Sequence, residues 1–113
     1  MAYYNYILHT LTEEDLLCQL AEEASELSQA ALKLRRAITH TNPTPVSESD
    51  AEANLIEEMA DVIFCCNLIE VKRSMLVGDR EKIRTQKTER WAKRLGWTKE
   101  TDICESDDNT VVD

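Results

Sequence analysis

Hydrophobic residues recur at helical spacing along most of the chain, beginning near Thr12. In the first long segment they return in steps of four and three: Leu20, Ala24, Leu27, Ala31, Leu34 and Ile38. This period places them on one face of an α-helix. Thr12 and Asp15 have the spacing of a capping box, in which each side chain accepts the backbone N–H of the other residue. These patterns predict a helix over residues 12–39 with one apolar seam.

A second helix is predicted after Ser47, whose hydroxyl suits an N-cap and is followed by acids in the first turn. Its apolar seam has the same period: Leu55, Met59, Val62, Cys66 and Ile69. Beside this seam, Ile56, Ile63 and Phe64 add more apolar surface than one partner helix covers. We expect a second copy of the chain to cover the excess, giving a homodimer or a homotetramer.

Glycine and proline mark the boundaries between the predicted helices. The polar segment THTNPTPVSESD, residues 39–50, holds both prolines and is predicted to be a loop. Gly78 interrupts the chain after the second helix. A third helix is predicted over residues 80–95, capped by Asp79 and ended by Gly96.

Charge is unevenly distributed over the carboxyl-terminal part of the chain. Residues 79–99 hold eight basic and three acidic side chains, whereas residues 100–113 hold six acids and no base. We expect the final segment to be a disordered, solvated tail. The predicted architecture is an all-α bundle of antiparallel helices over residues 1–99, completed by homo-oligomerisation, followed by the acidic tail over residues 100–113.

The whole chain has 13 basic and 22 acidic residues, a net charge of -9. This charge repels polyanions, which argues against nucleic-acid polymers and anionic membranes as partners. The longest fully apolar run, residues 62–66, is far too short to span a bilayer, and we recognise no signal peptide after Met1. None of the four cysteines forms a C-x-x-C pair, so we expect reduced thiols and a cytoplasmic protein.

Two short acidic motifs lie beside the apolar seams. Glu23 and Glu26 are three residues apart, as are Glu58 and Asp61. Residues at this spacing share one surface of a helix, so an antiparallel pairing of the two helices would bring the four carboxylates face to face. The alternative is that E-x-x-E and E-x-x-D are only solvated helix faces.

Four close carboxylates repel one another at neutral pH, so the face-to-face arrangement requires a positive charge. A hard divalent cation suits oxygen ligands, and Mg²⁺ leaves positions open for water and substrate phosphate. A di-iron site would need histidines in the motifs, but His9 and His40 are remote from them. No glycine-rich phosphate loop is present, so a phosphate substrate would rely on metal and on basic side chains of the third helix. The alternative is that this helix binds no phosphate and is only a solvated amphipathic helix docked on the acidic bundle.

The sequence resembles the MazG-like family of all-α nucleoside triphosphate pyrophosphohydrolases. The resemblance rests on three stretches: EEASELSQAALK, LIEEMADVIFCCNLI and KTERWAKRL. It covers about residues 16–95. It implies a hydrolase that cleaves a (deoxy)nucleoside triphosphate to the monophosphate and pyrophosphate, as housekeeping of the nucleotide pool.

The resemblance implies a role for each candidate residue. The implied ligands of Mg²⁺, for which Mn²⁺ is a substitute, are Glu23, Glu26, Glu58 and Asp61. Glu22 or Glu57 would act as general base or as a partner that orients the ligands. Lys87 and Arg90 would neutralise the β and γ phosphates. Asn67 would contact the base or the sugar, or alternatively bond to the backbone in the core.

Two features depart from the family pattern. The 31 residues between Glu26 and Glu58 make a long connection, and its proline loop could act as a lid or contact the base. The stretch DVIFCCN lacks the histidine of the phosphoribosyl-ATP pyrophosphohydrolases, which disfavours that branch. Two rival interpretations remain: a helical interaction or adaptor module whose acids only solvate the bundle, and a nucleotide sensor that does not hydrolyse its ligand.

Overall fold

Helices form nearly all of the computed structural model, which describes residues 2–41 and 46–102. In chain order they are α1 (Ala2–Thr10), α2 (Glu13–Thr39), α3 (Glu48–Lys72), α4 (Val77–Arg94) and the short 3-10 helix η1 (Lys99–Thr101). Within these described residues there is no strand, so the predicted all-α class is confirmed. The chain forms two compact units, Met1–Met75 and Leu76–Asp113.

The starts of α2 and α3 agree with the prediction. The Thr12 N–H donates to Asp15 Oδ2 over 3.0 Å, and the Asp15 N–H donates to Thr12 Oγ1 over 3.1 Å. At the start of α3, the Asp50 N–H donates to Ser47 Oγ over 3.1 Å. These bonds satisfy amide donors that have no partner inside the helix, and so they fix the first residue of each helix.

Helix α4 begins earlier than predicted, and Asp79 is not its cap. Leu76 occupies the N-cap position without a side-chain hydrogen bond, and Asp79 lies in the first turn. An acid in the first turn is stabilised by the positive end of the helix dipole, so the residue fits here equally well. The end of the helix agrees with the prediction, because Gly96 follows it with a φ of +101°. Glycine adopts this left-handed conformation without steric cost.

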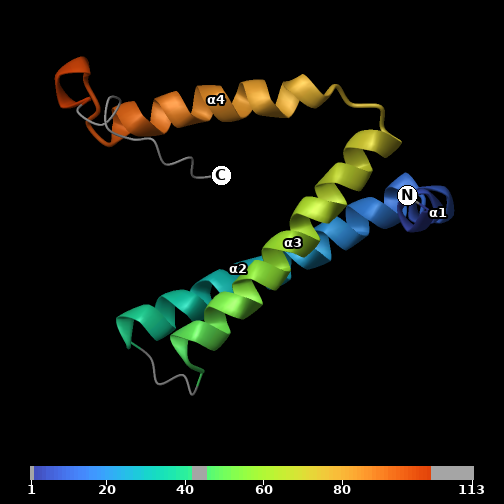
Figure 1. Ribbon diagram of the computed structural model, residues 1–113, viewed down its shortest axis with the longest axis horizontal. Coiled ribbons are helices and arrows are strands. Elements are labelled where there is room, and N and C mark those ends of the chain that lie inside the picture. Colours follow the sequence, from blue (N-terminus) through green and yellow to red (C-terminus); the bar gives the residue numbers. More distant parts are fainter. Residues whose placement is uncertain (1, 42–45, 103–113) are drawn as a thin grey trace. The chain divides into compact units, whose positions relative to one another are not determined.

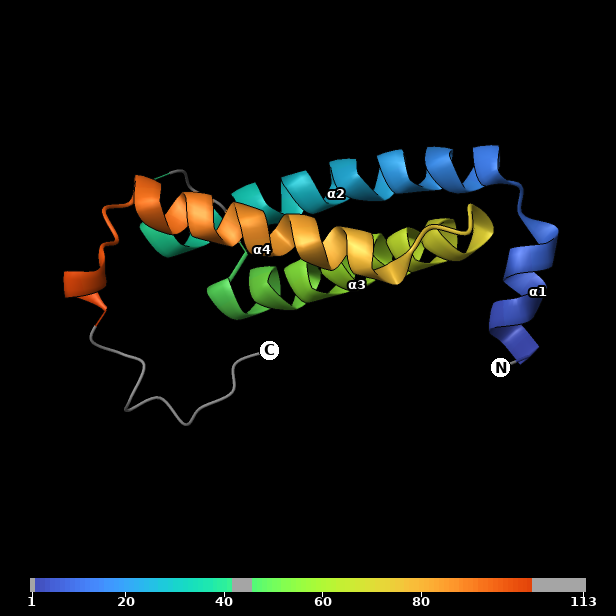
Figure 2. The same cartoon turned by 90° about the horizontal axis from the view of Figure 1, so that it is seen from above.

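Helices α2 and α3 pack side by side as an antiparallel hairpin (Figures 1 and 2). The predicted seams are partly wrong: Ala24, Ala31 and Ile38 are exposed on α2, and Met59 is 45 % exposed on α3. The positions that face the partner helix are buried or half-buried, and those of α2 are Leu16, Leu20, Glu23, Leu27, Ala30, Leu34 and Ala37. Those of α3 are Ala51, Leu55, Glu58, Val62, Cys65 and Ile69.

Small alanines are among the most buried residues of the observed seams. Ala30 and Ala51 are each 1 % exposed, and Ala37 is 8 % exposed. The separation of two packed helices depends on the side chains at their contact, and small residues permit a closer approach. Each seam keeps a repeat of three and four residues, as in two-helix coiled coils. In each helix, one glutamate occupies a position of this repeat that normally holds an apolar side chain.

Helix α1 was not predicted, and it runs across one end of the hairpin (Figure 2). The core of this unit lies beneath it, where Leu16, Leu68 and Ile69 form a buried cluster. Several partly buried residues pack against that cluster: Tyr4, Ile7, Leu8, Leu11 and Leu20. The Lys72 ammonium donates to the Leu8 carbonyl oxygen, and Arg73 pairs with Glu13. The apolar contacts and the Lys72 bond hold α1 on the hairpin, whereas the Arg73–Glu13 pair joins the end of α3 to the start of α2.

Two predicted segments lie largely outside the described residues. They are the centre of the proline loop, residues 42–45, and the acidic tail from residue 103 onward. None of the helices in the described ranges combines the length and the apolar character needed to cross a bilayer.

Candidate metal centre

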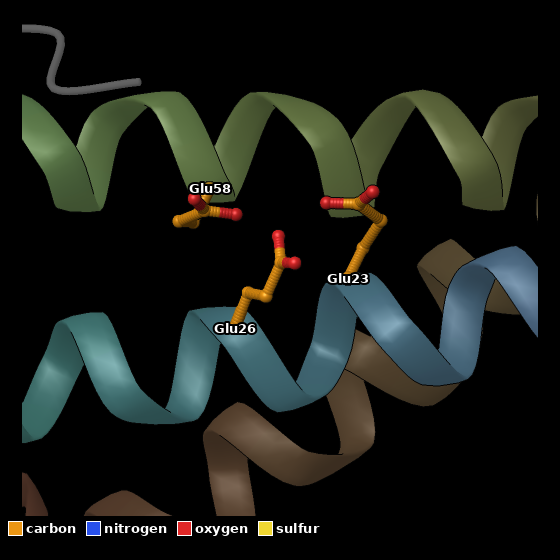
Figure 3. Close-up of side chains that lie close together, drawn as sticks. All are labelled: Glu23, Glu26 and Glu58. Atoms are coloured by element: carbon orange, nitrogen blue, oxygen red, sulfur yellow. The ribbon is translucent and has the colours of Figure 1, made fainter.

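Three carboxylates meet between α2 and α3. Glu23 and Glu26 extend from α2 and Glu58 extends from α3, all toward the space between the helices (Figure 3). One oxygen of each lies within 4.8 Å of an oxygen of each of the others. Glu23 and Glu58 are half-buried because they occupy seam positions, whereas Glu26 is exposed at the edge of the seam. We call these three residues the acid group.

Two oxygens of the acid group are buried without a hydrogen-bond donor. Glu23 Oε2 and Glu58 Oε2 have no partner among the residues that the structure describes. The other oxygen of Glu23 accepts a bond of 2.7 Å from the Gln19 amide. Buried polar atoms in folded proteins are nearly always paired, because an unpaired one loses its hydration without compensation. The acid group therefore calls for a donor or a cation that no side chain of the described residues supplies to these two oxygens.

The electrostatics of the acid group lead to the same requirement. Burial raises the pKa of the Glu58 carboxyl, and repulsion from Glu26, Asp61 and Glu23 adds to this effect. For Glu23 the strongest single influence is the Gln19 hydrogen bond, which lowers its pKa. Burial and repulsion from Glu26 and Asp61 outweigh that bond, so the net shift of the Glu23 pKa is upward. Both ionised carboxylates are thus destabilised by their surroundings, and a bound cation would relieve this.

The structure brings three of the four predicted metal ligands together. Asp61 is exposed and lies outside the acid group, although its charge acts on both Glu23 and Glu58. Glu22 and Glu57, the predicted general bases, are exposed and also lie outside the group. The roles given to these three residues stay predictions.

The predicted substrate ligands lie elsewhere on the chain. Lys87 and Arg90 are exposed on α4, which belongs to the second compact unit. Asn67 is exposed on α3 and lines neither of the two cavities that adjoin the acid group. Their roles in substrate binding stay predictions as well.

A cleft adjoins the acid group toward the connection between α2 and α3. Its volume is about 300 Å³. Its polar lining residues are Glu26, Gln29, Lys33, Arg36, Asn54 and Glu58. We call this cavity the basic cleft, because it adds two cations to the two acids. These two cations were not predicted as site residues, although the spacing of seven residues between Glu26 and Lys33 places both on one face of α2.

A second cavity adjoins the acid group toward α1. Its volume is also about 300 Å³. Its wall is mainly apolar, with acids at one side, and includes Ile7, Leu11, Phe64, Leu68, Glu23 and Asp61. We call it the α1 pocket. The ring of Phe64 meets the ring of Tyr4 edge to face, with centroids 6.4 Å apart, so α1 helps to hold this wall.

The chain matches no protein-family model, no curated protein and no solved structure. The resemblance to the MazG-like family therefore stays a prediction from the residues alone.

Proposed function

We propose that this protein is a Mg²⁺-dependent nucleotide pyrophosphohydrolase that cleaves a (deoxy)nucleoside triphosphate to the monophosphate and pyrophosphate. One observation carries the proposal: two buried carboxylate oxygens without a partner belong to a group of three acids contributed by two facing helices. Acidic side chains that only solvated a helix would lie on the exposed face, and here two of them occupy the seam.

The chemistry of the acid group favours a hard cation. All of its ligand atoms are carboxylate oxygens, which suit Mg²⁺ or Mn²⁺ better than zinc or copper. Glu23, Glu26 and Glu58 would hold the ion, with Asp61 beside them. When bound, such an ion neutralises phosphate charge and makes a water molecule more acidic.

The protein residues would position the reactants of hydrolysis. The water oxygen forms a bond to the α-phosphorus, and the bond from that phosphorus to the bridging oxygen of the β-phosphate breaks, so that pyrophosphate leaves. A carboxylate accepts the proton of the water, and Glu22 and Glu57 are the candidates for this role. Lys87 and Arg90 would balance phosphate charge, and Asn67 would contact the nucleoside.

We further propose that the active form is a homodimer or a homotetramer. Helix α3 is apolar on both sides: opposite its seam, Ile56 is 60 % exposed and Ile63 is 51 % exposed. A soluble monomer rarely leaves such a continuous apolar helix face in water. A second copy of this chain is the simplest cover, because a self-complementary interface needs only one surface.

A nucleotide panel tests the enzymatic proposal. Purified protein with Mg²⁺ should release pyrophosphate from at least one nucleoside triphosphate. Glu26→Gln and Glu58→Gln should each lower turnover by at least about 100-fold, because the ligands of a metal-dependent hydrolase act as one unit. Glu52→Gln, an exposed acid on α3, is the matched control and should retain activity. Full turnover in both ligand variants would contradict the proposal.

Thermal unfolding separates the enzyme from a non-catalytic helical module. A ligand that binds only the folded state raises its stability with concentration, so Mg²⁺ should raise the unfolding midpoint of the wild-type protein. The midpoint of a Glu23→Gln, Glu58→Gln double variant should not respond. An adaptor module predicts no response in either protein. Metal and nucleotide binding without product would identify a sensor.

A further inference from the structure

The two cavities lie on opposite sides of the acid group along the hairpin. The order of residues on α2 makes this plain: Gln19 and Glu23 line or adjoin the α1 pocket, whereas Glu26 and Lys33 line the basic cleft. Lys33 follows Glu26 by seven residues, about 10 Å along the helix axis. The acid group thus separates an apolar pocket from a cleft that carries cations.

The two cations of the basic cleft form no ion pair among the described residues. Lys33 and Arg36 are half-buried, and neither forms an ion pair with another residue in the described part of the chain. Half-buried cations in so acidic a unit would be expected to pair with a carboxylate. The amides of Gln29 and Asn54 line the same cleft. Cations and amide donors of this kind are the groups that bind phosphate oxygens.

The α1 pocket has the opposite character. Its exposed lining is mostly apolar, and it includes the aromatic residue Phe64, which is 42 % exposed. An aromatic ring on an apolar wall is a stacking surface for a nucleobase. Glu23 and Asp61 supply acceptors at the side of the pocket that adjoins the acid group.

From this arrangement we infer the direction in which a nucleotide lies on the hairpin. The β and γ phosphates occupy the basic cleft, bound by Lys33 and Arg36, and the nucleoside lies over the α1 pocket against Phe64. This inference rests on the proposed function. It places the α-phosphate at the acid group, between nucleoside and leaving pyrophosphate. Lys33 and Arg36 thereby become phosphate ligands from the same unit as the acids.

Binding of inorganic pyrophosphate in the presence of Mg²⁺, measured by calorimetry, tests the phosphate end. Lys33→Gln and Arg36→Gln should each weaken binding, and the double variant should weaken it by at least about tenfold, because charge-assisted hydrogen bonds to the anion are lost. Arg35→Gln is the matched control, since Arg35 is exposed on α2 and does not line the cleft. Wild-type affinity in the double variant would overturn the inference.

Binding of nucleoside monophosphates tests the other end. Phe64→Ala should weaken binding of the best monophosphate in a panel by about tenfold, the loss expected for one stacked base, and leave pyrophosphate binding unchanged. Val71→Ala, an exposed residue of the same helix that does not line the pocket, should leave both unchanged. Equal loss of both ligands in Phe64→Ala, or no loss of either, would overturn the assignment of this pocket.

These measurements separate failure of the inference from failure of the proposed function. If nucleotides are hydrolysed but pyrophosphate binding does not depend on Lys33 and Arg36, the enzymatic proposal is supported and the inferred direction of the nucleotide is wrong. If no nucleotide is hydrolysed but pyrophosphate binding depends on both residues, the phosphate site in the basic cleft is supported and the enzymatic proposal is wrong.

Discussion

The most informative residues are two glutamates at positions that usually hold apolar side chains. Glu23 lies between Leu20 and Leu27 in the repeat of α2, and Glu58 has the corresponding place in α3. A charged residue at such a position lowers the stability of the helix pair unless it is compensated. The raised pKa of each carboxyl reflects that cost.

Removing one of these charges should stabilise the metal-free protein, and the effect should depend on pH. The pKa of Glu58 is higher in the folded state than its ordinary value of 4.5, because of burial and the charges of Glu26, Asp61 and Glu23. Its ionisation therefore costs stability as pH rises above 4.5, and the full cost is reached above the folded-state pKa. Glu58→Gln should raise the unfolding midpoint in chelator at pH 7.5.

The advantage of Glu58→Gln should vanish below pH 4.5, where the wild-type carboxyl is protonated in both states. Thermal unfolding of the two proteins across this pH range measures the difference. Glu52→Gln, exposed on the same helix, should show no such pH-dependent gain. A Glu58→Gln variant that is less stable than wild type throughout would contradict the expected repulsion.

Cysteine reactivity should follow burial. Burial raises the pKa of the Cys65 thiol, and the charge of Glu23 adds to the shift, whereas Cys18 is exposed. Thiolates react and thiols do not, so iodoacetamide at pH 8 should modify Cys18 in the native protein and leave Cys65 intact. Peptide mapping by mass spectrometry measures both sites, and unfolded protein should react at both. Equal rates in the native state would show that Cys65 is accessible.

At the scale of the elements, local hydrogen bonds determine where the two long helices begin. Thr12 and Ser47 each accept a backbone N–H three residues ahead. Local hydrogen bonds do not determine which face of each helix is buried, because that depends on the partner helix. Leu20, Leu27 and Leu34 belong both to the predicted seam of α2 and to the observed one. The other positions differ, and contact with α3 selects Leu16, Glu23, Ala30 and Ala37 in place of Ala24, Ala31 and Ile38.

The cap of α3 gives a direct test at this scale. Ser47→Ala removes the oxygen that accepts the Asp50 N–H, and should lower the free energy of unfolding by about 1 kcal/mol. Ser49→Ala makes the same chemical change two residues later, inside the first turn of the helix. It should be neutral or slightly stabilising, since alanine is the better helix former. Urea unfolding of both variants measures the contrast, and equal losses would refute the capping role.

At the scale of the whole molecule, the apolar surface of α3 exceeds what the hairpin covers. Its seam faces α2, and Ile56 and Ile63 face away from that contact. Burial of such residues at an interface would contribute about 25 cal/mol for each Å² of apolar surface removed from water. This is the physical basis for expecting association of copies.

Light scattering after size exclusion measures the association. The wild-type chain should have a mass of at least twice its 13.0 kDa, and Ile63→Lys should shift it toward the monomer, because a charge would be buried at the interface. Ser25→Lys, an exposed substitution on α2, is the control and should leave the mass unchanged. A wild-type monomer at high concentration would refute oligomerisation.

The sequence alone determined the all-α class, the starts of α2 and α3, the end of α4 and the acidic pairs. Each depends on residues within one or two turns of each other, so the local pattern contains the needed information. It placed the start of α4 too late, because Asp79 suits a first turn as well as a cap. It also missed α1, whose docking depends on distant partners such as Leu68 and Ile69.

The tertiary structure decided which acids meet. Side chains at E-x-x-E spacing point to one surface in any helix, but packing of α2 on α3 placed Glu23, Glu26 and Glu58 together and left Asp61 exposed. It also placed Arg36 of α2 and Asn54 of α3 in the lining of one cleft. These residues are far apart along the chain, so the sequence gave no sign that they share a cleft. Local hydrogen bonds fix a helix from its own residues, whereas the rotation and pairing of helices depend on surfaces that only the folded chain brings into contact.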